Sequence, residues 1–128
     1  MGGEPVLTAL IGRPVAIPAA LIERFPELAT VRWRRGGLPV LVASLVLPRT
    51  GVAAITLWRT VFLAPHARLD AELLLHELRH VHQFEASAAF PLLYLLETLF
   101  HGYHRNRFEA DARAYASSRL RAGPELSA

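Results

Sequence analysis

The residues with the clearest capacity for chemistry lie at positions 76–80, where the sequence reads His-Glu-Leu-Arg-His, an H-E-x-x-H motif. On a helix, residues four positions apart project to the same side, so His76 and His80 can bind one zinc ion. Glu77 stands next to the first histidine, where its carboxylate can reach an attacking water. The flanking residues at 73–75 and 81 are apolar, and titratable groups in such surroundings need a compensating partner. We therefore predict a zinc site. The alternative is a surface helix with two exposed histidines.

A catalytic zinc site takes a third protein ligand and leaves a further position for water. The downstream sequence offers Glu97, His101, His104, Glu109 and Asp111. Glu109 is the best placed of these, because it lies at the start of a predicted helix that can pack against the helix of the H-E-x-x-H motif. Its alternative role is a capping box with the asparagine at position 106, since these residues have the spacing N-x-x-E. We favour Glu109 as the third zinc ligand.

This donor set predicts metal-assisted hydrolysis. Zinc lowers the pKa of a bound water and polarises a carbonyl, and Glu77 would act as the general base that takes the proton of the water and passes it to the leaving group. An oxyanion donor would complete the site. Tyr103 is the first choice for this catalytic role, and His101 and His104 are alternatives in the same loop. His82 lies two residues beyond His80, so we expect it to point to the other side of the helix and to pack there.

The combination of His76, Glu77 and His80 with a downstream helix that carries Glu109 resembles the gluzincin group of zinc metallopeptidases. The small size is similar to that of the single-domain minigluzincins. The resemblance covers roughly residues 53–116. It implies a zincin-like fold, one Zn²⁺ per chain held by His76, His80 and Glu109, Glu77 as the general base, and a peptide or protein substrate.

The sequence departs from the gluzincin pattern at one position. Many larger gluzincins place an aspartate four residues beyond the ligand glutamate, whereas this chain has Arg113 there and Asp111 nearby. The alternative function is a catalytically silent zinc-binding module of the same fold, with a regulatory or interaction role. The presence of Glu77 favours the enzyme, because a purely structural metal site does not need this carboxylate.

Three β-strands are predicted in the first half of the chain, and their short connections favour a small antiparallel or mixed three-stranded sheet. They are expected at residues 31–35, 39–47 and 53–63. Gly36-Gly37 is expected to form a hairpin turn, and residues 48–51 a second turn. The third strand alternates regularly, and as an edge strand near the zinc it could pair with an extended peptide. An ordinary sheet strand is the alternative.

Helices are predicted on both sides of this sheet. A short helix at residues 19–24 is opened by Pro18 and broken or restarted by Pro26, and it follows a loosely ordered arm at residues 1–16. After the sheet, helices are expected at residues 71–87, 91–101 and 106–121. Asp70 and Asn106 are N-caps, and Gly123-Pro124 ends the last helix. The prediction is an α+β fold, with the sheet followed by an active-site helix and two further helices.

Composition narrows the remaining choices. The 128 residues form one predicted domain, 1–128, and the lack of cysteine excludes disulfides and thiolate ligands. The net charge of +3 rests on scattered arginines, so we expect no nucleic-acid partner. The apolar runs are too short for a transmembrane span and no signal peptide is seen, which favours a cytoplasmic protein. The apolar helix at 90–100 is expected to pack over the zinc helix. Docking to a membrane, to a protein partner or to a second copy in a homo-oligomer is the alternative.

Overall fold

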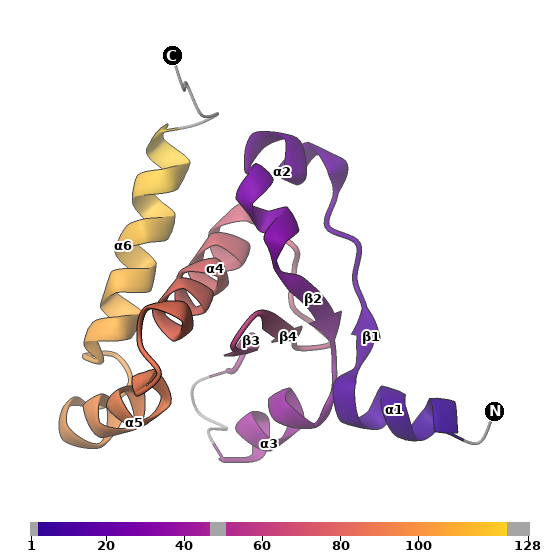
Figure 1. The fold of residues 1–128 in the computed structure, drawn as a ribbon, viewed down its shortest axis with the longest axis horizontal. Coiled ribbons are helices and arrows are strands. Elements are labelled where there is room, and N and C mark those ends of the chain that lie inside the picture. Colours follow the sequence, from indigo (N-terminus) through magenta and orange to yellow (C-terminus); the bar gives the residue numbers. More distant parts are fainter. Residues whose placement is uncertain (1–2, 47–50, 123–128) are drawn as a thin grey trace.

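The computed structural model describes residues 3–46 and 51–122, which form an α+β fold with a small sheet at its centre (Figure 1). The helices are α1 (Gly3–Ile11), α2 (Ala19–Arg24), the 3-10 helix η1 (Pro26–Thr30), α3 (Leu38–Val46), α4 (Ala71–Ala86), α5 (Phe90–His101) and α6 (Arg107–Ala122). The strands are β1 (Arg13–Pro14), β2 (Arg32–Arg35), β3 (Ala54–Leu57) and β4 (Thr60–Leu63). The predicted α+β class is confirmed.

The sheet is mixed and its strands follow the order β1-β2-β4-β3. Strand β2 runs parallel to β4, and the two outer pairs are antiparallel. The sheet has four strands where the sequence predicts three, because β1 is added, the predicted strand at 53–63 divides into β3 and β4, and the predicted strand at 39–47 is a helix. Strand β3 is at one end of this order and has only β4 beside it. Its other edge is open in the described part of the chain.

Helix α4 connects the sheet to the rest of the molecule. The side chain of Asp70 accepts a hydrogen bond from the backbone N–H of Leu73 at 2.8 Å, which caps the helix as predicted. One face of α4 packs on the sheet and η1, and α6 lies alongside α4. The largest fully buried apolar side chains of this core come from η1 and its flank, β4 and α4: Phe25, Leu28, Val61, Leu63, Leu74, Leu75, Leu78 and Val81. This packing fixes the direction in which the opposite face of α4 points.

The predicted strand at 39–47 is wrong, because these residues form α3. A continuous apolar run fits a buried strand or a helix equally well by its pattern, so tertiary packing decides. Val40 enters the core at 2% exposure, and Pro39 occupies the first turn of the helix, where its missing N–H costs nothing. Gly36-Gly37 consequently leads from β2 into α3 and makes no hairpin turn.

The single strand predicted at 53–63 is a hairpin. Strands β3 and β4 pair antiparallel around Trp58 and Arg59. Trp58 adopts a φ of 57°, a left-handed conformation that tight hairpin turns require and that glycine or asparagine usually supplies. Neither residue type occurs here, and the side-chain alternation expected of a strand continues through the turn. The sequence therefore gives no signal of the turn. The predicted turn at 48–51 lies outside the described residues except for Gly51, and Gly123-Pro124 lies outside them.

The N-terminal segment is more ordered than predicted, since α1 and β1 replace the expected loose arm at 1–16. The guanidinium of Arg34 donates to the backbone carbonyls of Ile11 and Gly12. Gly12 has a φ of +68°, and a Cβ there would lie 2.3 Å from the carbonyl oxygen of Arg35. Only glycine fits this close approach of the chain to β2.

The predicted packing of the 90–100 helix over α4 is confirmed for one face only, where Phe90 and Tyr94 contact Phe84 and His80. Phe90 of α5 is buried, but the other face of the helix is exposed and carries Leu92, Leu95, Leu96, Leu99 and Phe100. Among the described residues, no helix combines the length and apolar character needed to cross a bilayer.

Candidate metal centre

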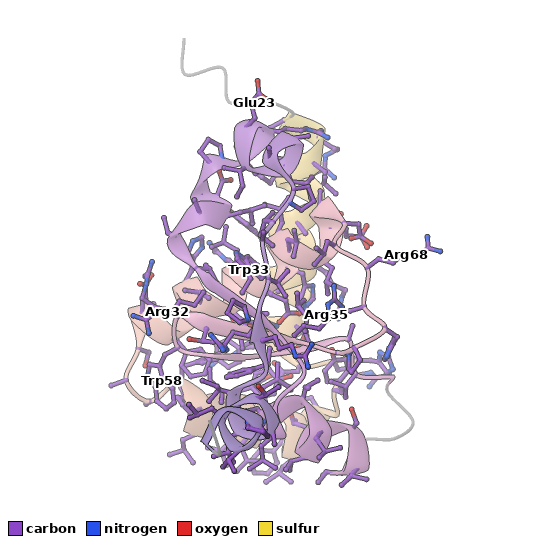
Figure 2. All side chains as sticks on the ribbon, turned by 90° about the vertical axis from the view of Figure 1, so that its right-hand side faces the viewer. Glu23, Arg32, Trp33, Arg35, Trp58 and Arg68 are labelled. Atoms are coloured by element: carbon purple, nitrogen blue, oxygen red, sulfur yellow. The ribbon has the colours of Figure 1, made fainter. Side chains whose placement is uncertain are left out.

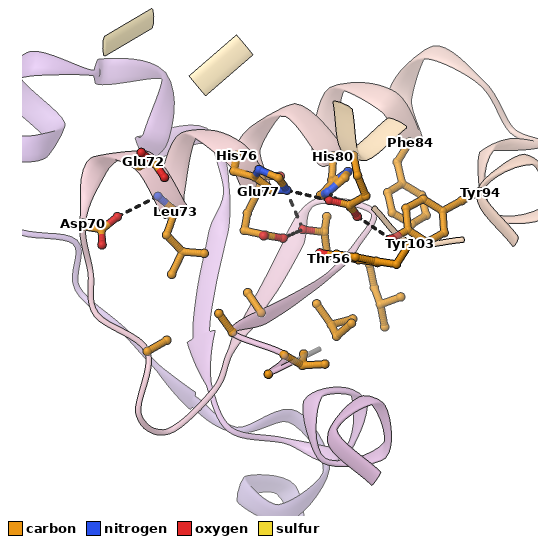
Figure 3. A pocket seen from close by; sticks show the side chains of 18 of the residues that line it. Thr56, Asp70, Glu72, Leu73, His76, Glu77, His80, Phe84, Tyr94 and Tyr103 are labelled. Carbon is orange, nitrogen blue, oxygen red and sulfur yellow. Dashed lines mark hydrogen bonds and ion pairs between the residues drawn. The ribbon is translucent and has the colours of Figure 1, made fainter. Parts of the chain in front are cut away.

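Helix α4 places His76 and His80 one turn apart on the face that borders a cavity beside β3 (Figure 3). Their ring centroids are 5.0 Å apart. His80 is buried at 7% exposure, and His76 is partly buried. The spacing of four residues therefore brings both rings to one side of the helix, as the sequence predicts.

Glu109 reaches both histidines from the first turn of α6. Its Oε1 lies 2.9 Å from Nε2 of His76, and its Oε2 lies 3.2 Å from Nε2 of His80. Asn106 caps the helix, because its side-chain oxygen accepts from the backbone N–H of Phe108 at 2.8 Å and of Glu109 at 3.4 Å. The Glu109 carboxylate is directed to the histidines. Of the two hydrogen bonds of a capping box, only the one accepted by the Asn106 side chain is therefore formed.

These three residues fit a metal ion by their geometry and by their chemistry. One ligand atom from each of His76, His80 and Glu109 lies within 4.8 Å of the others. A tetrahedral ion with bonds of about 2.0–2.1 Å needs donors about 3.4 Å apart, close to the two N···O distances above. Two imidazole nitrogens and one carboxylate oxygen form a donor set typical of catalytic zinc. Three protein donors also leave one coordination position open.

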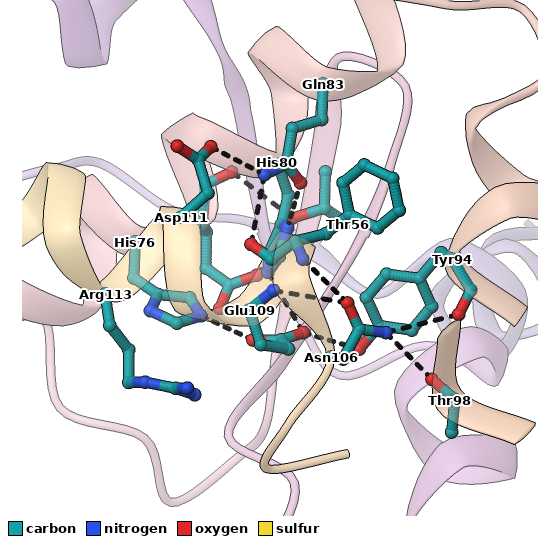
Figure 4. A network of polar contacts seen from close by, with 12 residues as sticks. Thr56, His76, His80, Gln83, Tyr94, Thr98, Asn106, Glu109, Asp111 and Arg113 are labelled. Atoms are coloured by element: carbon teal, nitrogen blue, oxygen red, sulfur yellow. Dashed lines mark hydrogen bonds and ion pairs between the residues drawn. The ribbon is translucent and has the colours of Figure 1, made fainter. Parts of the chain in front are cut away.

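A chain of polar contacts orients His80 from behind (Figure 4). Nδ1 of His80 lies 2.8 Å from the amide oxygen of Gln83, an atom that only accepts, so Nδ1 carries a proton and Nε2 is directed to Glu109. The amide nitrogen of Gln83 donates to Asp111 at 2.9 Å, and Arg79 donates to the same carboxylate at 2.8 Å. Asp111 thus supports the site through Gln83. The sequence analysis missed Gln83, although its position three residues after His80 on one helix could have indicated it.

Glu77 lies on the same helix but is not one of the three donors. It is buried at 6% exposure, and its Oε1 accepts a hydrogen bond of 2.9 Å from the hydroxyl of Thr56 on β3. Thr56 is itself buried at 9% exposure. The contact ties the carboxylate to the edge strand and fixes one of its oxygens. No sequence signal pointed to Thr56, because the contact depends on how β3 packs against α4.

Two tyrosines approach Glu109 from the loop and the helix before it. The hydroxyl of Tyr94 on α5 donates to Oε2 of Glu109 at 2.5 Å. Tyr103 lines the same cavity and is half-buried. Burial and the negative charge of Glu109 raise the pKa of both hydroxyls, so both stay protonated donors at neutral pH. Tyr103 is predicted from the sequence, but Tyr94 is not. Tyr94 lies within an apolar helix, and nothing in that segment indicates a polar role for it.

The charges of the centre are strongly coupled. Burial opposes ionisation of Glu109, but hydrogen bonds from His76, His80 and Tyr94 outweigh it and hold the pKa of Glu109 well below its ordinary value. Burial also opposes protonation of His80, yet the carboxylates of Glu109 and Glu77 raise its pKa to about 9. Without a metal, a proton on His80 therefore compensates the buried carboxylates. A divalent cation would supply the same compensation.

The centre opens into a cavity of about 710 Å³. One wall is the open edge of the sheet, residues 51–57, and another is α4. Aromatic side chains close the end near α5: Phe84 packs on Phe90 with ring centroids 4.7 Å apart, and Trp58 packs on Phe84 at 5.1 Å. The other end is polar and is lined by His66, Arg68, Asp70 and Glu72.

The remaining sequence candidates lie elsewhere. Glu97 accepts from the backbone N–H of Arg107 at 3.1 Å and is no ligand. His101 and His104 are exposed, and neither lines the cavity. His82 packs edge-on against Tyr115 with ring centroids 5.6 Å apart, in line with the predicted packing role. The Arg113 guanidinium donates to the backbone carbonyl of His104 at 3.0 Å.

Together, the fold and the site define a small α+β protein with a three-residue candidate metal centre beside an edge strand. The family model described as the eCIS core domain matches residues 17–88, more than half of the chain, and the protein belongs to this family. The match includes His76, Glu77 and His80 and ends before Glu109. The chain has no significant match among curated proteins or among solved structures.

Proposed function

We propose that this protein is a zinc-dependent peptidase of the gluzincin type, with His76, His80 and Glu109 as zinc ligands and Glu77 as the general base. The observation that carries the proposal is the placement of Glu77. It is a buried carboxylate in the cavity wall beside three metal donors, and it does not belong to the donor set. A site that only stabilises the fold has no use for such a group, because burying an extra carboxylate costs free energy.

The side chains divide the work of hydrolysis between them. When bound, zinc would polarise the scissile carbonyl and acidify the attacking water. Thr56 occupies one oxygen of Glu77, which leaves the other oxygen to accept the proton of the water and to deliver it to the leaving amine. The hydroxyl of Tyr103 faces the cavity as a neutral donor and supports a role in binding the oxyanion.

The open edge of β3 supports an extended peptide as the substrate. The carbonyl of Ala53 accepts from the N–H of Ala64 at 2.7 Å, so residues 53, 55 and 57 direct their backbone groups to β4. Ala54 and Thr56 then direct theirs outward, into the cavity that holds the metal donors. An extended chain can pair with these two residues and bring a peptide bond to Glu77.

The test is hydrolysis of a degenerate fluorogenic peptide library and of an unfolded protein by the zinc-loaded chain, compared with Glu77→Gln. We expect the variant to lose at least about a hundredfold in rate, because general-base catalysis contributes that much, and to keep its zinc. Glu85→Gln is the matched control, since it makes the same change at an exposed position of the same helix, outside the cavity. It should retain the wild-type rate.

Other outcomes are equally informative. Hydrolysis that persists in Glu77→Gln would refute the peptidase assignment. Stoichiometric zinc without hydrolysis of any substrate, in the wild type and in both variants, would favour the catalytically silent zinc-binding module.

A further inference from the structure

The large apolar side chains that remain exposed are confined to a few elements. In the described residues, all of them belong to α1, α3, α5 or the hairpin of β3 and β4. The three helices contribute Val6, Leu7, Leu10 and Ile11; Leu38, Leu41, Val42, Leu45 and Val46; and Leu92, Leu95, Leu96, Leu99 and Phe100. Several are more than two-thirds exposed, including Leu45 at 73% and Phe100 at 78%. We call this set the apolar face.

The apolar face occupies one end of the molecule. Helices α5, α3 and α1 lie along the lower edge in Figure 1, opposite α2 and the last turns of α6. The view turned by 90° again shows α1 and α3 at this lower end, where carbon atoms dominate the sticks (Figure 2). Helices α1 and α3 are in contact. Exposed apolar surface of this extent usually marks an interaction site.

Charge around the apolar face is one-sided. The three helices together contain only two acidic residues, Glu4 and Glu97, and Glu97 pairs with Arg107. An exposed arginine follows two of these helices at a short distance, Arg13 after α1 and Arg105 after α5. Apolar helices with basic residues at their ends complement an interface between anionic headgroups and acyl chains.

We propose that the apolar face docks onto an anionic lipid surface, with α1, α3 and α5 lying in the interface and arginines at its margin. A second copy of the chain fits less well, because self-association would bring arginine margins of the same sign together on a chain of net charge +3. Within the described ranges, none of these helices is long and apolar enough to cross the bilayer. The proposal does not depend on the metal centre, and the two can be tested separately.

The test is flotation of the purified protein with vesicles of phosphatidylcholine alone and of phosphatidylcholine with about one quarter phosphatidylglycerol. We expect the protein to float with the anionic vesicles and to be released by raised salt. Leu45→Glu and Leu99→Glu should each lower the partition coefficient about tenfold or more, because each replaces a large apolar contact with a charge. Arg105→Gln should lower it about fivefold on anionic vesicles and leave phosphatidylcholine unaffected.

Ser118→Glu is the matched control. It adds the same charge at an exposed position of α6 and should float like the wild type. Circular dichroism of each variant confirms folding, which is expected because the altered side chains are exposed. Equal binding to both vesicle types, unchanged in Arg105→Gln, would overturn the assignment to anionic lipid. Failure to float on either would overturn docking to lipid altogether. A concentration-dependent dimer abolished by Leu45→Glu would then assign the apolar face to a second copy.

Discussion

The candidate metal centre buries polar side chains, whereas the apolar face exposes apolar ones, so both depart from an ordinary protein but in opposite directions. Between α4 and α6 the molecule buries Glu77, His80, Asn106 and Glu109, which are residue types that usually stay in contact with water. At the lower end, α3 carries nine residues without a single charge and exposes most of its large side chains.

Both regions lower the stability of the fold relative to an ordinary core and surface, so they indicate where the chain serves a function other than folding. Every buried side-chain polar atom in the described residues has a hydrogen-bond partner. Hydrogen bonds therefore compensate the burial of the polar side chains and fix their orientation. The exposed side chains of the apolar face have no such compensation within the chain. They are stabilised only when a partner surface removes them from water. One region is therefore complete as a preorganised site, and the other requires a partner surface.

The largest effect is expected from removing a metal ligand. His80→Ala should weaken zinc binding several hundredfold, because a ligand carries about a quarter of the roughly 10–16 kcal/mol typical of a structural zinc site. Competition with a chromophoric chelator measures this affinity. Zinc at about a hundred times its Kd should also raise the Tm of the wild type by about 10 °C and leave that of His80→Ala nearly unchanged.

His82→Ala is the matched control, since it truncates a histidine of the same helix that packs against Tyr115. It should bind zinc like the wild type. Equal zinc affinity in His80→Ala and the wild type would mean that the buried polar cluster holds no metal, and the contrast with the apolar face would lose its functional meaning.

A smaller effect is expected at Tyr94, which positions Glu109 without being a ligand. Tyr94→Phe keeps the packing on Phe90 and Phe108 but deletes the hydroxyl that donates to Oε2 of Glu109. Zinc affinity should fall about ten- to a hundredfold, the usual effect of losing an outer partner of a ligand. Tyr103→Phe should leave zinc affinity unchanged and lower kcat. If the two variants behave alike, the tyrosines do not have separate roles.

The three candidate metal donors can be predicted from the sequence because their signal is local. Two histidines four residues apart have one arrangement on a helix, and Asn106 with Glu109 marks the start of another. Thr56 and Tyr94 could not be found in this way. Both reach the centre from other elements, β3 and α5, and nothing within their own segments depends on the contact.

The same distinction holds for the fold. The helices α4 and α6 have caps and clear periodicity, and they lie within a residue or two of their predicted bounds. The apolar run at 39–47 has neither, so its valines favour a strand while the parallel pairing of β2 with β4 requires a crossover between them. That requirement is a property of the whole sheet. It is absent from the nine residues that form α3.

The smallest effect is expected at the pair of Glu27 and Arg119, which joins η1 to α6 away from both regions, with N···O 2.7 Å. Burial favours the neutral form of Glu27, but Arg119 outweighs it and holds the pKa of Glu27 below its ordinary value of 4.5. A lowered pKa means that the pair stabilises the fold above pH 4.5 and that this contribution is lost as the pH falls through the folded-state pKa. Glu27→Gln should therefore lower the free energy of unfolding by about 1 kcal/mol at neutral pH and progressively less in acid.

Urea unfolding of the metal-free protein measures the free energy of unfolding at both pH values. The exposed Glu23→Gln is a control that should change it at neither pH. If the difference in unfolding free energy between Glu27→Gln and the wild type does not change with pH, the pair contributes packing alone. The charges that matter for this fold would then lie chiefly at the candidate metal centre.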